Sequence, residues 1–139
     1  MSEQQTPNIS SGPLVRWPFV LAGLGALGVA LARTILGGRN DLPLLVSNLE
    51  RPAMAAVIYI NWYALNLAYA TLGVALLVGT VLHRSAARTI GVVAAIIFGA
   101  ACALFMYFVL QTTGSPFTFF PWIPLALTAL LSAFAAWRV

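Results

Sequence analysis

Charged residues are scarce in this sequence, and lysine is missing altogether. Asp, Glu, Lys and Arg together make up 7% of the 139 residues, whereas a soluble domain carries about 25%. So few charges cannot cover a water-facing surface, which excludes an ordinary soluble globular protein. Hydrophobic residues make up 61% of the chain. Because several apolar runs reach the roughly 20 residues that a helix needs to cross a bilayer, we expect an integral membrane protein.

The side chains that commonly perform catalysis or bind metals are also scarce. The chain has one histidine, His83, one cysteine, Cys102, and three carboxylates, Glu3, Asp41 and Glu50. No two of them are spaced for general acid and base catalysis, and no cluster of them matches a metal site. A lone cysteine forms no internal disulfide and is typical of a small apolar filler. We therefore expect no enzyme activity, no catalytic residue, no metal and no cofactor.

Charges, glycines and prolines divide the apolar sequence into four runs. The predicted fold is all-α, an integral membrane four-helix bundle with spans at about 17–36, 55–82, 89–110 and 119–137. Residues 1–14 are polar and are predicted to form a disordered cytoplasmic tail ahead of the transmembrane domain, 15–139.

The connection after the first run is expected to contain a helix of its own. Gly37 and Gly38 should end the first span, because glycine tolerates the left-handed conformation common at helix ends. Asp41 then caps an apolar turn, which predicts a short interfacial helix in this first outer loop. Residues 30–32 resemble a signal-peptide cleavage site, so cleavage stays an alternative, but the long leader with Arg16 as its one positive charge favours a retained span.

Two of the runs carry small residues at four-residue spacing, a pattern that lets membrane helices approach closely. The first set is Ala22, Ala26 and Ala30, and the second is Gly91, Ala95, Gly99 and Ala103. We expect both sets to lie at helix–helix contacts, and we assign them no other role.

The run 55–82 has the most informative polar pattern. At about 100° per residue, one helical face holds Tyr59, Trp62, Tyr63, Asn66, Tyr69 and Gly73. Because an unpaired amide in hydrocarbon costs several kcal/mol, Asn66 should face protein or a cavity. Arg33, Tyr107 and Trp122 are expected at a similar depth, near the outer leaflet.

Two interpretations of this region stay open. In the first, which is favoured because aromatic belts are common, Asn66 bridges two helices and Arg33 reaches toward the membrane surface. In the second, a small pocket opens outward and Arg33 faces an anionic or carbonyl group of a ligand. The residues of that pocket would be Arg33, Tyr59, Tyr63, Asn66, Tyr107 and Trp122.

Four short motifs carry a resemblance to known proteins: Leu36-Gly37-Gly38, Asp41-Leu42-Pro43-Leu44-Leu45, Asn61-Trp62-Tyr63 and Pro121-Trp122. Together they resemble a family of small, uncharacterised bacterial four-transmembrane-helix membrane proteins. At the level of fold alone, the chain is similar to the DoxX-like group, some members of which are linked to redox membrane complexes. Histidines are common in the family at the positions of Arg33 and Tyr63, so the resemblance implies that their work is lost here. It also implies the bacterial inner membrane and no known activity.

We therefore expect a non-enzymatic accessory or interaction protein of the inner membrane. Its expected partners are the lipid bilayer and either further copies of itself or another membrane protein. The alternative is a binder or transporter of a small lipophilic or anionic molecule through an outer-leaflet pocket, and a third hypothesis is a DoxX-like redox accessory subunit. Proton-driven transport is disfavoured because no predicted span contains Asp, Glu, His or Lys. No nucleic-acid partner is expected, because most of the arginines flank apolar runs as interface anchors.

The arginine distribution predicts that both termini lie in the cytoplasm. With the turn 83–88 inside, the inner arginines are Arg16, Arg84, Arg88 and Arg138, and the outer ones are Arg33, Arg39 and Arg51. Alkaline phosphatase needs an oxidising compartment for its disulfides. A fusion of it after residue 139 should therefore be inactive in bacteria, and an insertion at residue 45 should be active. An active C-terminal fusion would reverse this topology.

Overall fold

A computed structural model describes residues 16–47, 49, 51–115, 117 and 121–139. The predicted tail, residues 1–14, lies outside this part of the chain. Within it all regular structure is helical and no strand occurs, which confirms the all-α prediction. The elements are α1 (Trp17–Ala32), the π-helical turn η2 (Arg33–Gly37), α2 (Gly38–Ser47), α3 (Pro52–Gly79), α4 (Arg84–Thr113) and α5 (Trp122–Arg138).

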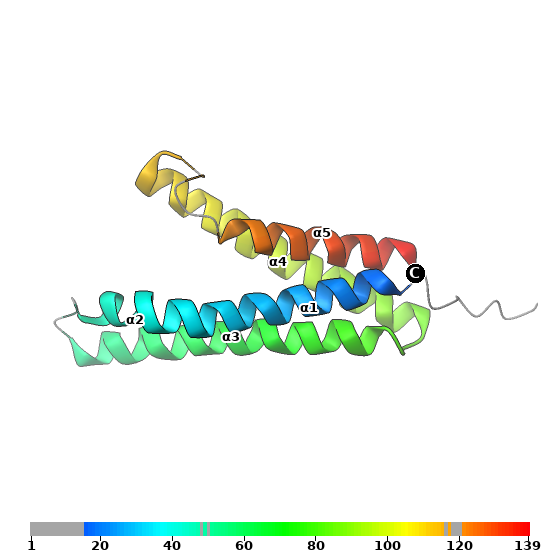
Figure 1. Ribbon diagram of the computed structural model, residues 1–139, viewed down its shortest axis with the longest axis horizontal. Helices are drawn as coiled ribbons and strands as arrows, with labels where there is room; N and C mark the ends of the chain where they lie inside the picture. Colours follow the sequence, from blue (N-terminus) through cyan, green and yellow to red (C-terminus); the bar gives the residue numbers. More distant parts are fainter. Residues whose placement is uncertain (1–15, 48, 50, 116, 118–120) are drawn as a thin grey trace, which may run out of the picture.

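The helices form two antiparallel pairs. α1 runs beside α3 and α4 runs beside α5, while α1 also packs against α5 (Figure 1). The start of α1, the end of α5 and the turn from α3 to α4 lie at one end of the molecule (Figure 1). At the other end, the C-terminal part of α4 stands away from α2 and from the start of α3, so that the two pairs form a V (Figure 1).

The first helix does not end at Gly37 and Gly38, which corrects the sequence prediction. The single π-turn η2 joins α1 to α2, and Gly38 keeps right-handed helical angles, φ −66° and ψ −30°. Helix therefore continues from Trp17 to Ser47, so the residues that were expected to form a separate short helix in the first loop extend the first helix instead. The left-handed glycine cap occurs at Gly114 instead (φ 70°), where α4 ends.

α1 and α3 cross at a pair of glycines. A methyl group on Gly23 would lie 2.9 Å from the carbonyl oxygen of Gly73, and one on Gly73 would lie 3.0 Å from that of Gly23. Ala22 and Ala26 beside this crossing are fully buried, and Ala30 is 6% exposed. The small residues predicted on the first span therefore lie at helix contacts, as expected.

The small residues predicted on the third span are placed correctly only in part. A methyl group on Gly91 would lie 2.9 Å from the Cβ of Ala136, so α5 packs on this residue. At Gly99 a methyl group would meet nothing within 4 Å, and Ala103 is exposed. The buried residues in the first half of α4 are Ala87, Gly91, Ala94 and Phe98. Their alternating spacing of four and three follows the 3.6-residue turn, from which a strict four-residue repeat drifts away.

Three helical segments are long and apolar enough to cross a membrane, namely Trp17–Ser47, Pro52–Gly79 and Arg84–Thr113. α5 has 17 residues, which is the lower limit of about 17 for a spanning helix. Large apolar side chains face outward on all four segments, among them Leu31, Leu67, Ile96 and Leu130, which are 62–69% exposed.

Two glycines of α1 provide a test of the α1–α3 crossing. Gly23→Ala should lower the melting temperature in detergent, because its methyl group would lie 2.8 Å from Leu77 Cγ and overpacking costs about 1–3 kcal/mol. Gly28→Ala is the matched control, since nothing lies within 4 Å of the added methyl and the change gains up to about 1 kcal/mol of helix propensity. Equal melting temperatures for the two variants would contradict the crossing.

Candidate functional site

Arg33 is tied to α3 through Asn66. The Nε of Arg33 donates a hydrogen bond to Asn66 Oδ1 over 2.9 Å, and Asn66 Nδ2 donates to Thr34 Oγ1 over 3.2 Å. The Thr34 hydroxyl in turn donates to the carbonyl of Ala30 over 2.8 Å. Asn66 is 5% exposed, so both ends of its buried amide have the partners that such a group requires. Asn66 therefore faces the protein interior, as its helical face predicts.

Trp62 lies against the first helix because Gly37 has no side chain. A methyl group on Gly37 would lie 2.5 Å from Trp62 Cζ2, a separation that no real side chain tolerates. The guanidinium carbon of Arg33 lies 4.3 Å from the centre of the Trp62 ring, which is a cation–π contact. The indole Nε1 is buried and has no hydrogen-bond partner among the described residues. Gly37, Trp62 and Arg33 thus form one packed unit.

A cavity of about 890 Å³ opens beside this unit, where the two helix pairs diverge. Its size falls within the range of about 300–1,000 Å³ that small-molecule sites show. The lining residues whose side chains carry polar groups are Arg33, Asp41, Trp62 and Tyr69. The apolar part of the wall includes Leu36, Leu44, Leu45, Phe105 and Leu125. The composition of the wall is therefore that of a ligand site, mostly apolar with a few polar groups.

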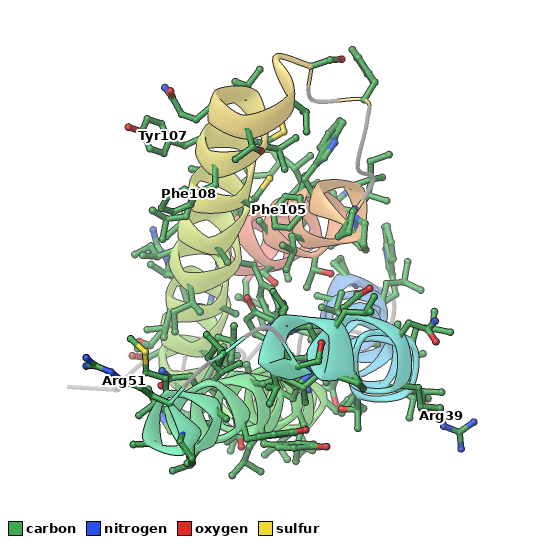
Figure 2. All side chains as sticks on the ribbon, turned by 90° about the vertical axis from the view of Figure 1, so that its left-hand side faces the viewer. Arg39, Arg51, Phe105, Tyr107 and Phe108 are labelled. Atoms are coloured by element: carbon green, nitrogen blue, oxygen red, sulfur yellow. The ribbon has the colours of Figure 1, made fainter. Side chains whose placement is uncertain are left out.

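Two aromatic side chains connect the cavity to the second helix pair. Tyr69 of α3 lines the cavity, is 2% exposed and stacks on Phe98 of α4, with ring centres 5.0 Å apart and planes 26° apart. Phe105 projects from the side of α4 that faces the other helices, whereas Tyr107 and Phe108 project from the opposite side (Figure 2). The wall of the cavity therefore comes from all four helical segments.

The six residues predicted to line a pocket are only partly brought together. Arg33 lies on the cavity wall, and Asn66 holds it there by accepting the hydrogen bond from its Nε. Tyr59 and Tyr63 are 39% and 50% exposed and are absent from the wall. The buried residues of α3 are Asn66, Tyr69, Gly73, Leu76 and Gly79. Tyr63 lies off this buried face. Tyr59 lies near the start of α3, where fewer elements cover the helix.

The other two predicted residues belong to the second helix pair. Tyr107 is 57% exposed and points away from the cavity (Figure 2). Trp122 packs edge-on against Phe117, with ring centres 6.4 Å apart, and its carbonyl accepts a hydrogen bond from the Cys102 thiol over 3.6 Å. Neither residue lines the cavity, although Pro121 and Pro124 on either side of Trp122 do.

Sequence reasoning missed Gly37 and Asp41 as members of the site. Arg33, Gly37 and Asp41 are spaced four residues apart, and this spacing places side chains on a similar face of a helix. The signal was present in the sequence, but it becomes visible only if the first helix continues through the glycine pair. Trp62 and Tyr69 did share the predicted face of α3, without being selected as pocket residues.

Comparisons with known proteins find no relative for this chain: no family model, no curated protein and no solved structure matches it. The resemblance drawn from four short motifs therefore stays a prediction. In the described part of the chain, no three His, Cys, Asp or Glu side chains group closely enough to hold a metal ion. Any functional assignment has to come from the cavity and its wall.

A double-mutant cycle should detect the Arg33–Asn66 hydrogen bond. We expect Arg33→Met and Asn66→Leu each to change the free energy of unfolding. The double variant should differ from the sum by about 0.6 kcal/mol, the mean for interhelical bonds in membranes, and by no more than about 1.7 kcal/mol, the largest measured value. The measurement is reversible unfolding in mixed micelles. Additive single effects would show that the 2.9 Å contact contributes no coupling.

Proposed function

We propose that this protein is embedded in a membrane and binds an amphiphilic molecule in the cavity beside Arg33. The anionic group of that molecule binds the guanidinium, and its apolar part packs on Leu36, Leu44 and Leu45. The role is one of binding and holding, which agrees with a non-enzymatic accessory protein. Three segments of spanning length support the membrane location, and the resemblance favours the bacterial inner membrane.

The arrangement in the bilayer follows from helix length. The segment Trp17–Ser47 has 31 residues and is about 46 Å long at 1.5 Å per residue, which exceeds the ~30 Å hydrocarbon core. We infer that α2 extends into the interface, with exposed Arg39 and Asp41 at headgroup depth. The proposal includes four crossings, with α5 as the shortest, and both termini in the cytoplasm.

The guanidinium of Arg33 is the observation that supports binding. An arginine has five N–H donors, and the Nε donor is used by Asn66. The two terminal nitrogens have no hydrogen-bond partner within the described residues, although Arg33 lies on the wall of a mostly apolar cavity. A charged group in apolar surroundings is unfavourable without a partner of opposite charge. A ligand with an anionic group supplies that partner.

The geometry of Arg33 favours this interpretation over that of a membrane anchor. An anchoring arginine extends its chain to the membrane surface, whereas Arg33 is turned onto the buried Asn66 and onto the face of Trp62. Because Asn66 holds Nε, the free edge of the guanidinium is the one formed by the two terminal nitrogens. Two parallel N–H donors match the two oxygens of a carboxylate or a phosphate.

Binding of radiolabelled palmitate in nanodiscs of uncharged lipid tests the proposal. Arg33→Gln should weaken binding by about tenfold to a hundredfold, because a hydrogen bond to a charged group contributes about 1.5–3 kcal/mol. Arg39→Gln is the matched control: it removes the same charge from a side chain that points outward from the molecule (Figure 2). This control should bind palmitate like the parent protein.

Two results would contradict the proposal. Parental affinity in Arg33→Gln would show that the guanidinium does not bind the anionic group. Equal losses in Arg33→Gln and Arg39→Gln would assign the effect to general surface charge, which acts over about 10 Å at moderate ionic strength.

A further inference from the structure

The cavity wall carries two opposite charges. Arg33 and Asp41 both line the cavity, and both belong to the continuous helix from Trp17 to Ser47. Eight residues of helix separate them, a rise of about 12 Å along the axis. Although both residues are described, they do not form an ion pair with each other. The cavity wall therefore carries one cationic and one anionic side chain that do not pair with each other.

The Trp62 indole lies next to both charges. Its ring centre is 4.3 Å from the guanidinium carbon of Arg33. Its Cζ2 is 2.5 Å from the point where a methyl group on Gly37 would sit, and Asp41 Oδ2 is 3.5 Å from that same point. Arg33 and Asp41 therefore both lie near this indole, which packs on the helix at Gly37.

Other arginines near this end of the molecule do not neutralise Asp41. Arg39 and Arg51 project outward on opposite sides (Figure 2), and no ion pair to Asp41 occurs in the described part of the chain. An ionised carboxylate only accepts hydrogen bonds, and a guanidinium only donates them. The wall therefore offers an acceptor group and a donor group to one bound molecule.

We propose that the ligand of this cavity is a zwitterionic amphiphile with an anionic group, a protonated amine and an apolar chain. The inference rests on the proposed function of the cavity and specifies its ligand class. The anionic group binds the terminal nitrogens of Arg33, the ammonium donates to the carboxylate of Asp41, and the chain packs on Leu36, Leu44 and Leu45. A purely anionic head, such as that of palmitate, should bind more weakly than a zwitterionic one, because it brings a second negative charge close to Asp41.

Three single-chain probes that share one acyl chain and differ only in the head test the ligand class. Lysophosphatidylethanolamine has a phosphate and a primary ammonium, lysophosphatidylcholine has an ammonium without N–H donors, and lysophosphatidylglycerol has a phosphate and no amine. The parent protein should bind the ethanolamine probe about fivefold more tightly than the glycerol probe, the size expected for a partly screened ion pair. The affinity for the choline probe should lie between the affinities for the other two.

Asp41→Asn keeps the shape of the side chain and removes its charge. It should weaken binding of the ethanolamine probe and make its affinity equal to that of the glycerol probe. The control is the double variant Asn40→Asp with Asp41→Asn, which keeps the net charge but moves the carboxylate to an exposed residue outside the cavity wall. This control should not restore the preference for the ethanolamine head.

The outcomes separate this inference from the proposed function. If Arg33→Gln weakens all three probes while Asp41→Asn leaves their ratio unchanged, the zwitterionic class is overturned and anion binding stands. If no probe and no palmitate binds the parent protein, the proposed function itself is overturned.

The same chemistry has two sources, a bilayer lipid or a free single-chain amphiphile. Native mass spectrometry of the protein released from nanodiscs of two-chain phosphatidylethanolamine and phosphatidylglycerol distinguishes them. Selective retention of the two-chain ethanolamine lipid supports a bilayer lipid. Selective binding of the single-chain ethanolamine probe alone supports a free amphiphile. Equal retention of both headgroups, in both chain forms, would overturn the inference.

Discussion

The contact between Trp62 and the backbone at Gly37 is the constraint on which the cavity depends. With no Cβ at Gly37, the indole approaches the first helix to a distance that any side chain would prevent. That approach supplies the aromatic face for the Arg33 guanidinium, 4.3 Å away. Because the helix continues past Gly37, Asp41 and the leucines of α2 reach the same cavity. One small residue therefore brings the aromatic, cationic and anionic groups together.

The sequence predicts the helical segments well because long apolar runs have few alternatives. The boundaries are predicted less well: α3 runs from Pro52 to Gly79 where the span 55–82 was expected, and α4 begins at Arg84, inside the basic turn expected at 83–88. The glycine pair at 37 and 38 misleads because glycine has two uses, a left-handed backbone or a close approach. Here Gly37 serves close approach to Trp62 with helical angles, and only the packing of α3 distinguishes the two uses.

The candidate site could be predicted only where a single helix determines it. Asn66 had to face protein because of its amide, and it does, with a bond to Arg33. Tyr59 and Tyr63 lie near that face by angle, but the direction of burial is set by α1, which packs over Gly73 and Gly79. The exposure of Tyr107 depends on how α4 diverges from the first helix pair, and the periodicity of α4 does not predict that divergence. Placement across helices therefore needed the structure.

The Arg33–Asn66 hydrogen bond fits both interpretations of this region, so the bond alone does not decide between them. An interhelical bond needs only the amide and one donor, and Thr34 supplies a second contact to the amide on the same helix. The guanidinium of Arg33 has more donors than this bond needs. Its terminal nitrogens have no partner among the described residues, and they border a mostly apolar cavity. Asparagine and tryptophan fix the direction of this charge, and a fixed, unneutralised charge loses less conformational freedom when an anion binds. The structural bond and the proposed binding site thus depend on one arrangement, in which packing orients a charge that has no partner among the described residues.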